Sequence, residues 1–228
     1  LGDVYKRQDF RNASLISEVA RILEIPWVYE VRGERDKTLE LEHSGQRSRE
    51  FLAEFRRRET QAMQAASAVL VLSEVSRRRV EERGVPKDNI YIVPNGFDRD
   101  EAIEAPTRDF AREKIGIPSN TKLVGTITSV VDYEGLDSLV LALEFLDEDT
   151  KALIVGSGSE LPALQQLTEE RGLTDRVVFA GKQDPEAIPL WCAALDVFVL
   201  PRRDYEVCRA VTPLKPCLLY TSPSPRDR

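Results

Sequence analysis

The chain has few of the residues that build disulfide, zinc or membrane-spanning structures. Its 228 residues include one histidine, His43, and three cysteines, and these do not have the spacing of a zinc site. It also lacks an apolar run of the roughly 18 residues that a transmembrane helix needs. These absences argue against a disulfide scaffold, a zinc site and a membrane span, and they favour a protein of the reducing cytosol.

Positive charge is in deficit as well. The 32 lysine and arginine residues are outnumbered by 39 aspartate and glutamate residues, which gives a formal net charge of −7. An acidic chain has no general attraction for nucleic acid or anionic lipid, so no nucleic-acid partner is expected. The runs Arg56–Arg58 and Arg77–Arg79 are local exceptions. They leave open a peripheral association of the parent protein with the inner face of a membrane.

The two ends of the chain are predicted to be foreign to the rest. One encoding of Asp3–Gln8 is GAT GTG TAT AAG AGA CAG, and the reverse complement of that DNA encodes Cys217–Ser222 in another frame. This DNA is identified as the mosaic end used in transposase library preparation. We therefore expect residues 1–8 and 217–228 to be adapter-derived and exclude them from fold prediction. On this interpretation both edges of the remaining chain are cuts.

Between the ends, strand and helix signals alternate. Short β-branched runs predict strands at residues 27–31, 68–72, 90–93, 122–127, 152–155, 177–180 and 197–200. Apolar residues at helical spacing predict helices near residues 15–23, 46–66, 136–146, 160–171 and 185–194. A further helix is predicted between the cap Ser73 and Gly84, and Asp184 is expected to cap the helix that begins at Pro185. This alternation predicts an α/β fold with parallel sheets covered by helices.

The strongest local signal is the glycine turn Gly156-Ser157-Gly158, which follows a buried strand and opens a helix. Backbone N–H groups at such a turn suit a phosphate or a ribose hydroxyl, although any tight strand-to-helix turn also needs glycine. A dehydrogenase is disfavoured, because the third glycine of the dinucleotide fingerprint is missing and the strand is not the first of its block.

Two further stretches follow strands of the same block. Gly181 and Lys182 follow residues 177–180, and Arg202 and Arg203 follow residues 197–200. Guanidinium groups at the carboxyl edge of a sheet can grip phosphate, although a solvated charge pair is the competing interpretation. The acidic run 147–149 lies on the opposite edge and is predicted to be a solvated loop.

In order and spacing, the set of fragments resembles the family 4 glycosyltransferases of the GT-B fold. The similar stretches are Ile25–Gly33, Val71–Glu74, Arg83–Pro86, Ile92–Gly96, Gly125–Asp137, Gly156–Glu160, Val177–Gly181 and Ala193–Pro201. The stretch Val211–Pro216 looks like a subgroup linked to exopolysaccharide assembly. The resemblance implies two Rossmann-like domains, both incomplete. Residues 9–98 would form the acceptor-side domain, 99–120 a linker with a lead-in helix, and 121–216 the donor-binding domain.

The resemblance also implies a retaining transfer of a sugar from a nucleotide-diphosphate donor to a glycan or lipid-linked acceptor, as in cell-surface polysaccharide synthesis. It implies no metal and no cofactor, since the nucleotide sugar is a substrate. The expected donor-binding residues are Ser129, Gly156, Ser157, Gly158, Gly181, Lys182, Arg202, Arg203 and Lys215. Glu30 and Arg32 are expected on the acceptor side, where pairing with neighbours is an equal alternative.

This sequence departs from the family pattern where the donor phosphates are expected. Ser129 and Glu134 stand where many members carry Arg and Lys, so cations must come from elsewhere. The family's Glu-x7-Glu pair falls on Ala210 and on position 218, which lies in the adapter-like end. We therefore expect this fragment to bind donor poorly and to transfer nothing. A nucleotide-binding Rossmann module without transfer activity is the alternative.

Overall fold

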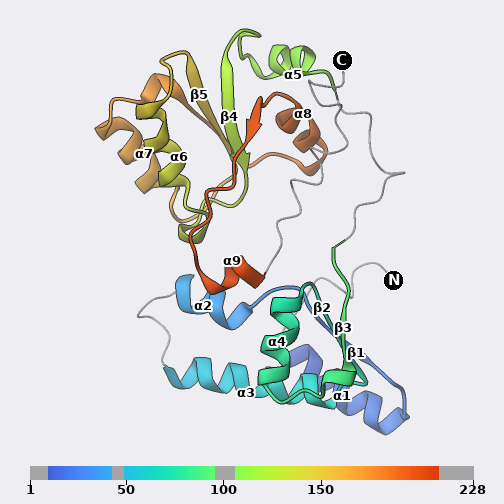
Figure 1. Ribbon diagram of the computed structural model, residues 1–228. Coiled ribbons are helices and arrows are strands. Elements are labelled where there is room, and N and C mark those ends of the chain that lie inside the picture. The colour runs from blue at the N-terminus through green and yellow to red at the C-terminus, as the bar shows by residue number, and fades with distance from the viewer. Residues whose placement is uncertain (1–9, 43–48, 96–105, 211–228) are drawn as a thin grey trace. The chain divides into compact units, whose positions relative to one another are not determined.

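A computed structural model describes residues 10–42, 49–95 and 106–210 of the chain (Figure 1). The chain forms two compact units. Of the described residues, 10–42, 49–95 and 205–210 belong to unit 1, and 106–204 belong to unit 2. Each unit contains one parallel sheet, which confirms the predicted α/β class.

The sheet of unit 1 has the order β1-β2-β3, with each strand parallel to its neighbour. The strands are β1 (Val28–Val31), β2 (Ala68–Val71) and β3 (Ile90–Ile92), and the helices are α1 (Phe10–Leu23), α2 (Arg35–Glu42), α3 (Arg49–Ala65) and α4 (Glu74–Glu82). A core of buried apolar side chains joins α3 and α4 to this sheet: Met63, Ala66, Val69, Val71, Val80, Val85 and Ile90.

The predicted ends of α4 are confirmed. Ser73 precedes the helix in an extended conformation, and its hydroxyl accepts a hydrogen bond from the N–H of Ser76 at 3.2 Å. Gly84 follows the helix with φ of +83°, a conformation that glycine adopts without strain. Local sequence chemistry therefore fixes both ends of this helix.

Helix α1 has its large apolar side chains on the exposed side. Ala13 and Ala20 are buried, whereas the large apolar residues are 45–65% exposed: Leu15, Ile16, Val19, Ile22 and Leu23. The helix packs against α3. Small residues thus make its contact within unit 1.

Unit 1 also contains a helix from much later in the sequence, which was not predicted from the sequence. Helix α9 (Glu206–Ala210) contacts α2 and α4. The hydroxyls of Ser73 and Ser76 both donate to the carbonyl oxygen of Ala210, at 3.1 and 3.3 Å. At the other end of the helix, Glu206 lies 3.3 Å from the Lys37 ammonium group.

The sheet of unit 2 has the order β6-β5-β4-β7, again with parallel neighbours. Its strands are β4 (Lys122–Ile127), β5 (Thr150–Val155), β6 (Val177–Gly181) and β7 (Val197–Phe198), and its helices are α5 (Arg108–Ile115), α6 (Leu136–Ala142), α7 (Leu161–Glu170) and α8 (Ile188–Ala193). One-turn 3₁₀ segments extend several elements. They include Leu143–Phe145 after α6 and Pro185–Ala187 before α8.

Alternate residues of β5 enter two different cores. Ala152 and Ile154 pack with α6 and α7, whereas Leu153 and Val155 pack with residues of α5 and α8. This follows from the two-residue repeat of a strand, and it explains why β5 is a continuous apolar run. Figure 1 shows α6 and α7 on one side of the sheet and α8 on the other.

One capping prediction is wrong. Asp184 lies at the N-cap of the 3₁₀ segment before α8, but its side chain makes no capping hydrogen bond. Its backbone carbonyl instead accepts from the N–H of Ala187 at 2.9 Å. The turn is closed by main-chain atoms and by Pro185, whose fixed φ suits the first position of a helix.

Candidate functional site

Sheet order identifies one position in unit 2 where ligands of open α/β sheets bind. From β4 the chain adds β5 and β6 on one side and then returns to place β7 on the other side of β4. Ligands of such sheets bind beyond the carboxyl ends of the strands, where the strand order reverses. We call residues 128–135 after β4 and 199–203 after β7 the switch-point loops.

A buried ion pair joins the switch-point loops. Arg202 donates to both carboxylate oxygens of Glu134, at 2.8 and 3.1 Å. The Glu134 side chain is only 4% exposed and that of Arg202 is 21% exposed. Glu134, which was expected to repel phosphate, is therefore neutralised by Arg202, which was expected to bind phosphate.

The neighbouring Arg203 has two carboxylate partners. Its guanidinium lies 3.0 Å from both Asp132 and Asp137, whose side chains are 46% and 37% exposed. Its backbone N–H donates to the Tyr133 carbonyl at 3.0 Å. These two aspartates were not predicted as partners, because only the sheet order brings their loop beside β7.

The loops also meet through their backbones. Gly135 has φ of +65°, and a Cβ atom there would lie 2.2 Å from the carbonyl oxygen of Pro201. Only glycine fits this contact without displacement. The switch-point loops are thus held together by main-chain packing as well as by ion pairs.

The two arginines differ in what their release would cost. Removing one partner of a buried ion pair generally costs about 3–5 kcal/mol, because an uncompensated charge stays buried. Pairs between exposed charges contribute about 0–1 kcal/mol. By this comparison Arg202 is fixed to Glu134, whereas Arg203 can leave its aspartates at little cost.

Backbone atoms of the loop after β4 pack directly against the glycine turn after β5. A Cβ atom on Gly156 would lie 1.8 Å from the Thr128 carbonyl oxygen, and one on Gly158 would lie 2.1 Å from that of Val130. The N–H of Gly156 donates to Gly181 at 2.8 Å. Both glycines therefore have a structural reason to be glycine, and the Gly156 amide is already engaged.

The remaining predicted donor residues lie at the same edge but are not all brought together. Ser129, Ser157 and Lys182 are at least partly exposed. Because β5 and β4 separate β6 from β7, Lys182 follows a strand about 14 Å from the one that carries the two arginines. Lys215 and position 218 lie outside the described residues. Ala210, the other position of the expected glutamate pair, is buried at the end of α9.

In unit 1, the predicted acceptor-side residues lie at the carboxyl end of β1. Glu30 and Arg32 form an ion pair at 3.3 Å, and Arg32 donates to the side-chain oxygen of Asn95 at 3.3 Å. Both ionic side chains are more than a third exposed. They pair with neighbours, as the alternative interpretation had it, and remain accessible from solvent.

A pocket of about 210 Å³ adjoins the switch-point loops. Its charged lining residues are Asp132, Asp137, Glu160 and Arg203. Three carboxylates around one guanidinium disfavour an anion inside this pocket. A diphosphate would instead have to draw Arg203 away from it.

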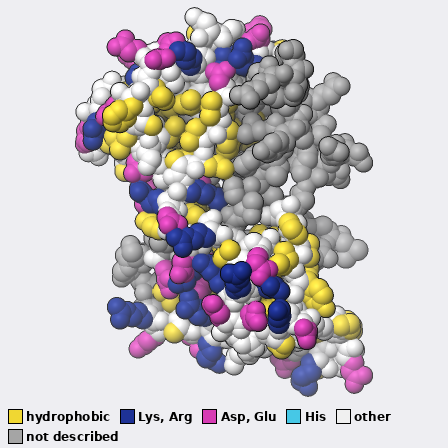
Figure 2. Space-filling model, viewed as in Figure 1, with side chains coloured by type: hydrophobic (Ala, Val, Ile, Leu, Met, Phe, Trp, Pro, Cys, Tyr) yellow, Lys and Arg dark blue, Asp and Glu magenta, His cyan; other side chains and the backbone are white. Residues whose placement is uncertain are grey.

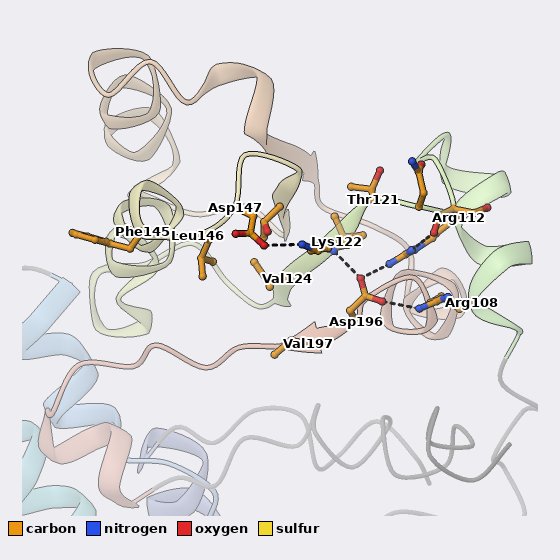
Figure 3. Close-up of a pocket in the computed structure, with 14 residues that line it drawn as sticks. Arg108, Arg112, Thr121, Lys122, Val124, Phe145, Leu146, Asp147, Asp196 and Val197 are labelled. Carbon is orange, nitrogen blue, oxygen red and sulfur yellow. Dashed lines mark hydrogen bonds and ion pairs between the residues drawn. The ribbon is translucent and has the colours of Figure 1, made fainter.

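A larger pocket, of about 680 Å³, lies at the amino ends of β4, β5 and β7 (Figure 3). Its cations are paired with its acids. Lys122 lies 2.7 Å from Asp147, Arg108 lies 2.9 Å from Asp196, and Arg112 lies 2.6 Å from Asp196. Since ligands of parallel sheets bind at the carboxyl edge, this pocket is not the expected site. Asp147 is exposed here, as predicted for the 147–149 loop.

Asp196 organises the amino edge. Burial by itself would raise the pKa of Asp196, but hydrogen bonds from the Leu123 N–H and the Arg112 guanidinium outweigh it and hold this pKa below its ordinary value. The contacts to Leu123 and Arg112 measure 2.8 and 2.6 Å. The ionised carboxylate therefore stabilises the fold.

This lowered pKa predicts how stability depends on pH. The stabilisation by Asp196 is fully present above the ordinary carboxyl pKa of about 4 and is lost as pH falls through the lower folded value. We expect the gap in unfolding free energy between wild type and Asp196→Asn to be constant near neutrality and to shrink below about pH 4. Urea unfolding between pH 3 and 7 measures it, with the exposed Asp175→Asn as control. A gap that does not change with pH contradicts the prediction.

The arginine runs of unit 1 are interspersed with acids. Arg57 and Arg58 both pair with Glu54, and the Arg56 guanidinium lies 2.7 Å from Asp36. In the second run, Arg77 contacts Glu74. Figure 2 shows basic and acidic side chains side by side on the visible face of this unit. The runs do not form a surface of one sign, which weakens the case for electrostatic membrane binding.

Within the described ranges, no helix is both long and apolar enough to span a bilayer.

Two family models match the chain. Residues 7–96 match the model described as glycosyl transferase 4-like domain, and residues 107–211 match the model described as glycosyl transferases group 1. Together the two matches take in both described sheets.

Curated relatives and solved structures agree with these matches. A D-inositol 3-phosphate glycosyltransferase of Xylanimonas cellulosilytica is 32% identical over 60% of this chain and 36% of its own length. The putative colanic acid biosynthesis glycosyl transferase WcaI of Escherichia coli is 26% identical over 53% of this chain and 30% of its own. The crystal structure of Anabaena Alr3699/HepE in complex with UDP superimposes with a TM-score of 0.69 at 22% identity, covering 85% of this chain and 51% of that one. The chain thus spans about a third of the length of these curated relatives.

Proposed function

We propose that this chain, which belongs to the group 1 glycosyltransferases, carries the donor site of an enzyme that transfers a sugar from a nucleotide diphosphate to a glycan or lipid-linked acceptor. The observation that carries the placement is the reversal of strand order at β4. The donor would lie beyond the carboxyl ends of β4 and β7, where ligands of such sheets bind.

In this proposal the fold acts by positioning and by electrostatic stabilisation. Charge develops on the diphosphate as the sugar leaves, and fixed cations and dipoles at the switch-point loops would stabilise it. Arg203 is paired with exposed carboxylates, and Ser129 of the loop after β4 is at least partly exposed. The transfer would be retaining and would use no metal.

The acceptor is proposed to lie at the carboxyl edge of unit 1, near Glu30 and Arg32. A carboxylate and a guanidinium on one edge can each hydrogen-bond sugar hydroxyls. A role in cell-surface polysaccharide synthesis is supported by the similarity to a relative named for colanic acid biosynthesis.

Binding specificity tests this proposal. We expect UDP, GDP or ADP to bind the chain more tightly than the matching nucleosides, because the diphosphate is the recognised group. NAD, whose diphosphate bridges two nucleosides, is expected to bind more weakly because the dinucleotide fingerprint is missing. Isothermal titration measures the affinities, and sugar-transfer assays of the whole protein measure the activity. Tight NAD binding without nucleoside diphosphate binding would overturn the proposal. Nucleoside diphosphate binding without transfer by the whole protein would favour a non-catalytic nucleotide-binding module.

A further inference from the structure

We propose that the two neighbouring arginines after β7 have separate roles. Arg203 turns from Asp132 and Asp137 to the diphosphate of the donor, whereas Arg202 stays on Glu134 and holds the switch-point loops together. The inference rests on the proposed function, since it divides the donor site between a binding residue and a positioning pair.

The partners of the two arginines carry this distinction. The Glu134 carboxylate is buried and receives two hydrogen bonds from Arg202. A phosphate that attracted Arg202 would leave that carboxylate buried without its countercharge. Asp132 and Asp137 are exposed enough for water to solvate them when Arg203 leaves.

The backbone around Arg203 allows its side chain to move alone. Its N–H bonds to the Tyr133 carbonyl, and the packing of Gly135 against Pro201 joins the same loops two residues away. Neither of these two contacts involves the guanidinium. The Arg203 Nε–H also donates to the Asp132 carbonyl at 3.0 Å, and this exposed bond is given up when the side chain moves. The side chain can therefore change partners while the loop backbones stay paired.

Electrostatics also gives the movement a direction. The small pocket that Arg203 now lines contains Asp132, Asp137 and Glu160, so it repels a diphosphate. A diphosphate would bind outside this pocket, at the switch point, and attract the guanidinium outward. Glu134 replaces a cation of the family pattern in this chain, and here it would act by fixing Arg202.

Arginine Nε–H signals in the NMR spectrum of the full wild-type chain report on the two side chains directly. During titration with sodium pyrophosphate and separately with UDP, we expect the Arg203 signal to shift and the Arg202 signal to stay in place. A shift of the Arg202 signal with an unchanged Arg203 signal would overturn the division of roles. This measurement needs no variant other than those that assign the signals.

Variants give the matched comparison. Arg203→Ala is expected to weaken pyrophosphate and UDP binding about tenfold, with a melting temperature near that of wild type. Arg202→Ala and Glu134→Gln are expected to lower the melting temperature, because each leaves the buried partner unpaired. Equal ligand affinity in wild type and Arg203→Ala would refute the inference, as would weakened binding by Arg202→Ala at an unchanged melting temperature.

The two ligands separate this inference from the proposed function. If pyrophosphate binding depends on Arg203 but UDP, GDP and ADP bind no more tightly than pyrophosphate, the arginine roles stand and the nucleotide-sugar site fails. If a nucleoside diphosphate binds tightly and equally to wild type and Arg203→Ala, the donor site stands and the arginine roles fail. Because this chain is expected to bind donor weakly, the titrations extend to roughly millimolar ligand. If neither kind of ligand binds wild type even there, both fail.

Discussion

Arg112→Ala is expected to destabilise unit 2 by about 3 kcal/mol. The Arg112 side chain is 1% exposed, and its guanidinium donates to Asp196 and to the carbonyl oxygens of Ala194 and Ser119. The substitution removes all three bonds and leaves a cavity beside α5 and β4. Thermal unfolding measures the effect, which corresponds to a fall in melting temperature of roughly 10–20 °C for a unit of this size.

Lys122→Ala is the matched control for Arg112→Ala. Lys122 lines the same pocket and pairs with Asp147 and Asp149, but all three side chains are more than half exposed. We expect its removal to leave the melting temperature almost unchanged. Similar losses in the two variants would show that burial of the Arg112 network does not determine its contribution.

Gly158→Ala is expected to have the second large effect, a loss of roughly 3 kcal/mol or more in the stability of unit 2. The added methyl group would lie 2.1 Å from the carbonyl oxygen of Val130 and 2.6 Å from its carbon. Backbone atoms cannot rotate away as a flexible side chain can. Chemical denaturation measures the loss, and accumulation of insoluble protein on expression is its extreme form.

A second glycine separates crowding from backbone conformation. Gly116 ends α5 with φ of +74°, and a methyl group added there would have no heavy atom within 4 Å. We expect Gly116→Ala to cost only about 1–2 kcal/mol, the penalty of a left-handed conformation. If Gly158→Ala proves milder than Gly116→Ala, the tight contact between the loops after β4 and β5 does not limit stability.

Local chemistry made much of the fold predictable. The strand Lys122–Ile127 has the predicted bounds, and the Ser73 cap is confirmed by its bond from Ser76. These features depend on residues a few positions apart. Side-chain alternation, capping and positive φ act over that range, so the sequence pattern contains them.

The arrangement of the candidate site depended on longer separations. Glu134 and Arg202 are 68 residues apart, and their pairing follows from β7 lying beside β4 rather than beside β6. Both residues were singled out from the sequence, but Glu134 was expected to repel phosphate and Arg202 to bind it. Helix α2 and helix α9 were not predicted. The five-residue α9 is too short for a helical period to be visible, and its docking on Ser73 spans 137 positions.

The docking of α9 has a consequence for the order in which the protein forms. Unit 1 is built from two segments of the chain, and more than a hundred residues, which belong to unit 2, separate them in the sequence. During synthesis Ser73 and Ser76 are made long before Ala210. Until α9 is made and docks, their hydroxyls lack this carbonyl partner. Closing so long a loop is entropically costly and slow unless the intervening chain is already compact. Folding of unit 2 is therefore the step that shortens the search and lets the first unit be completed.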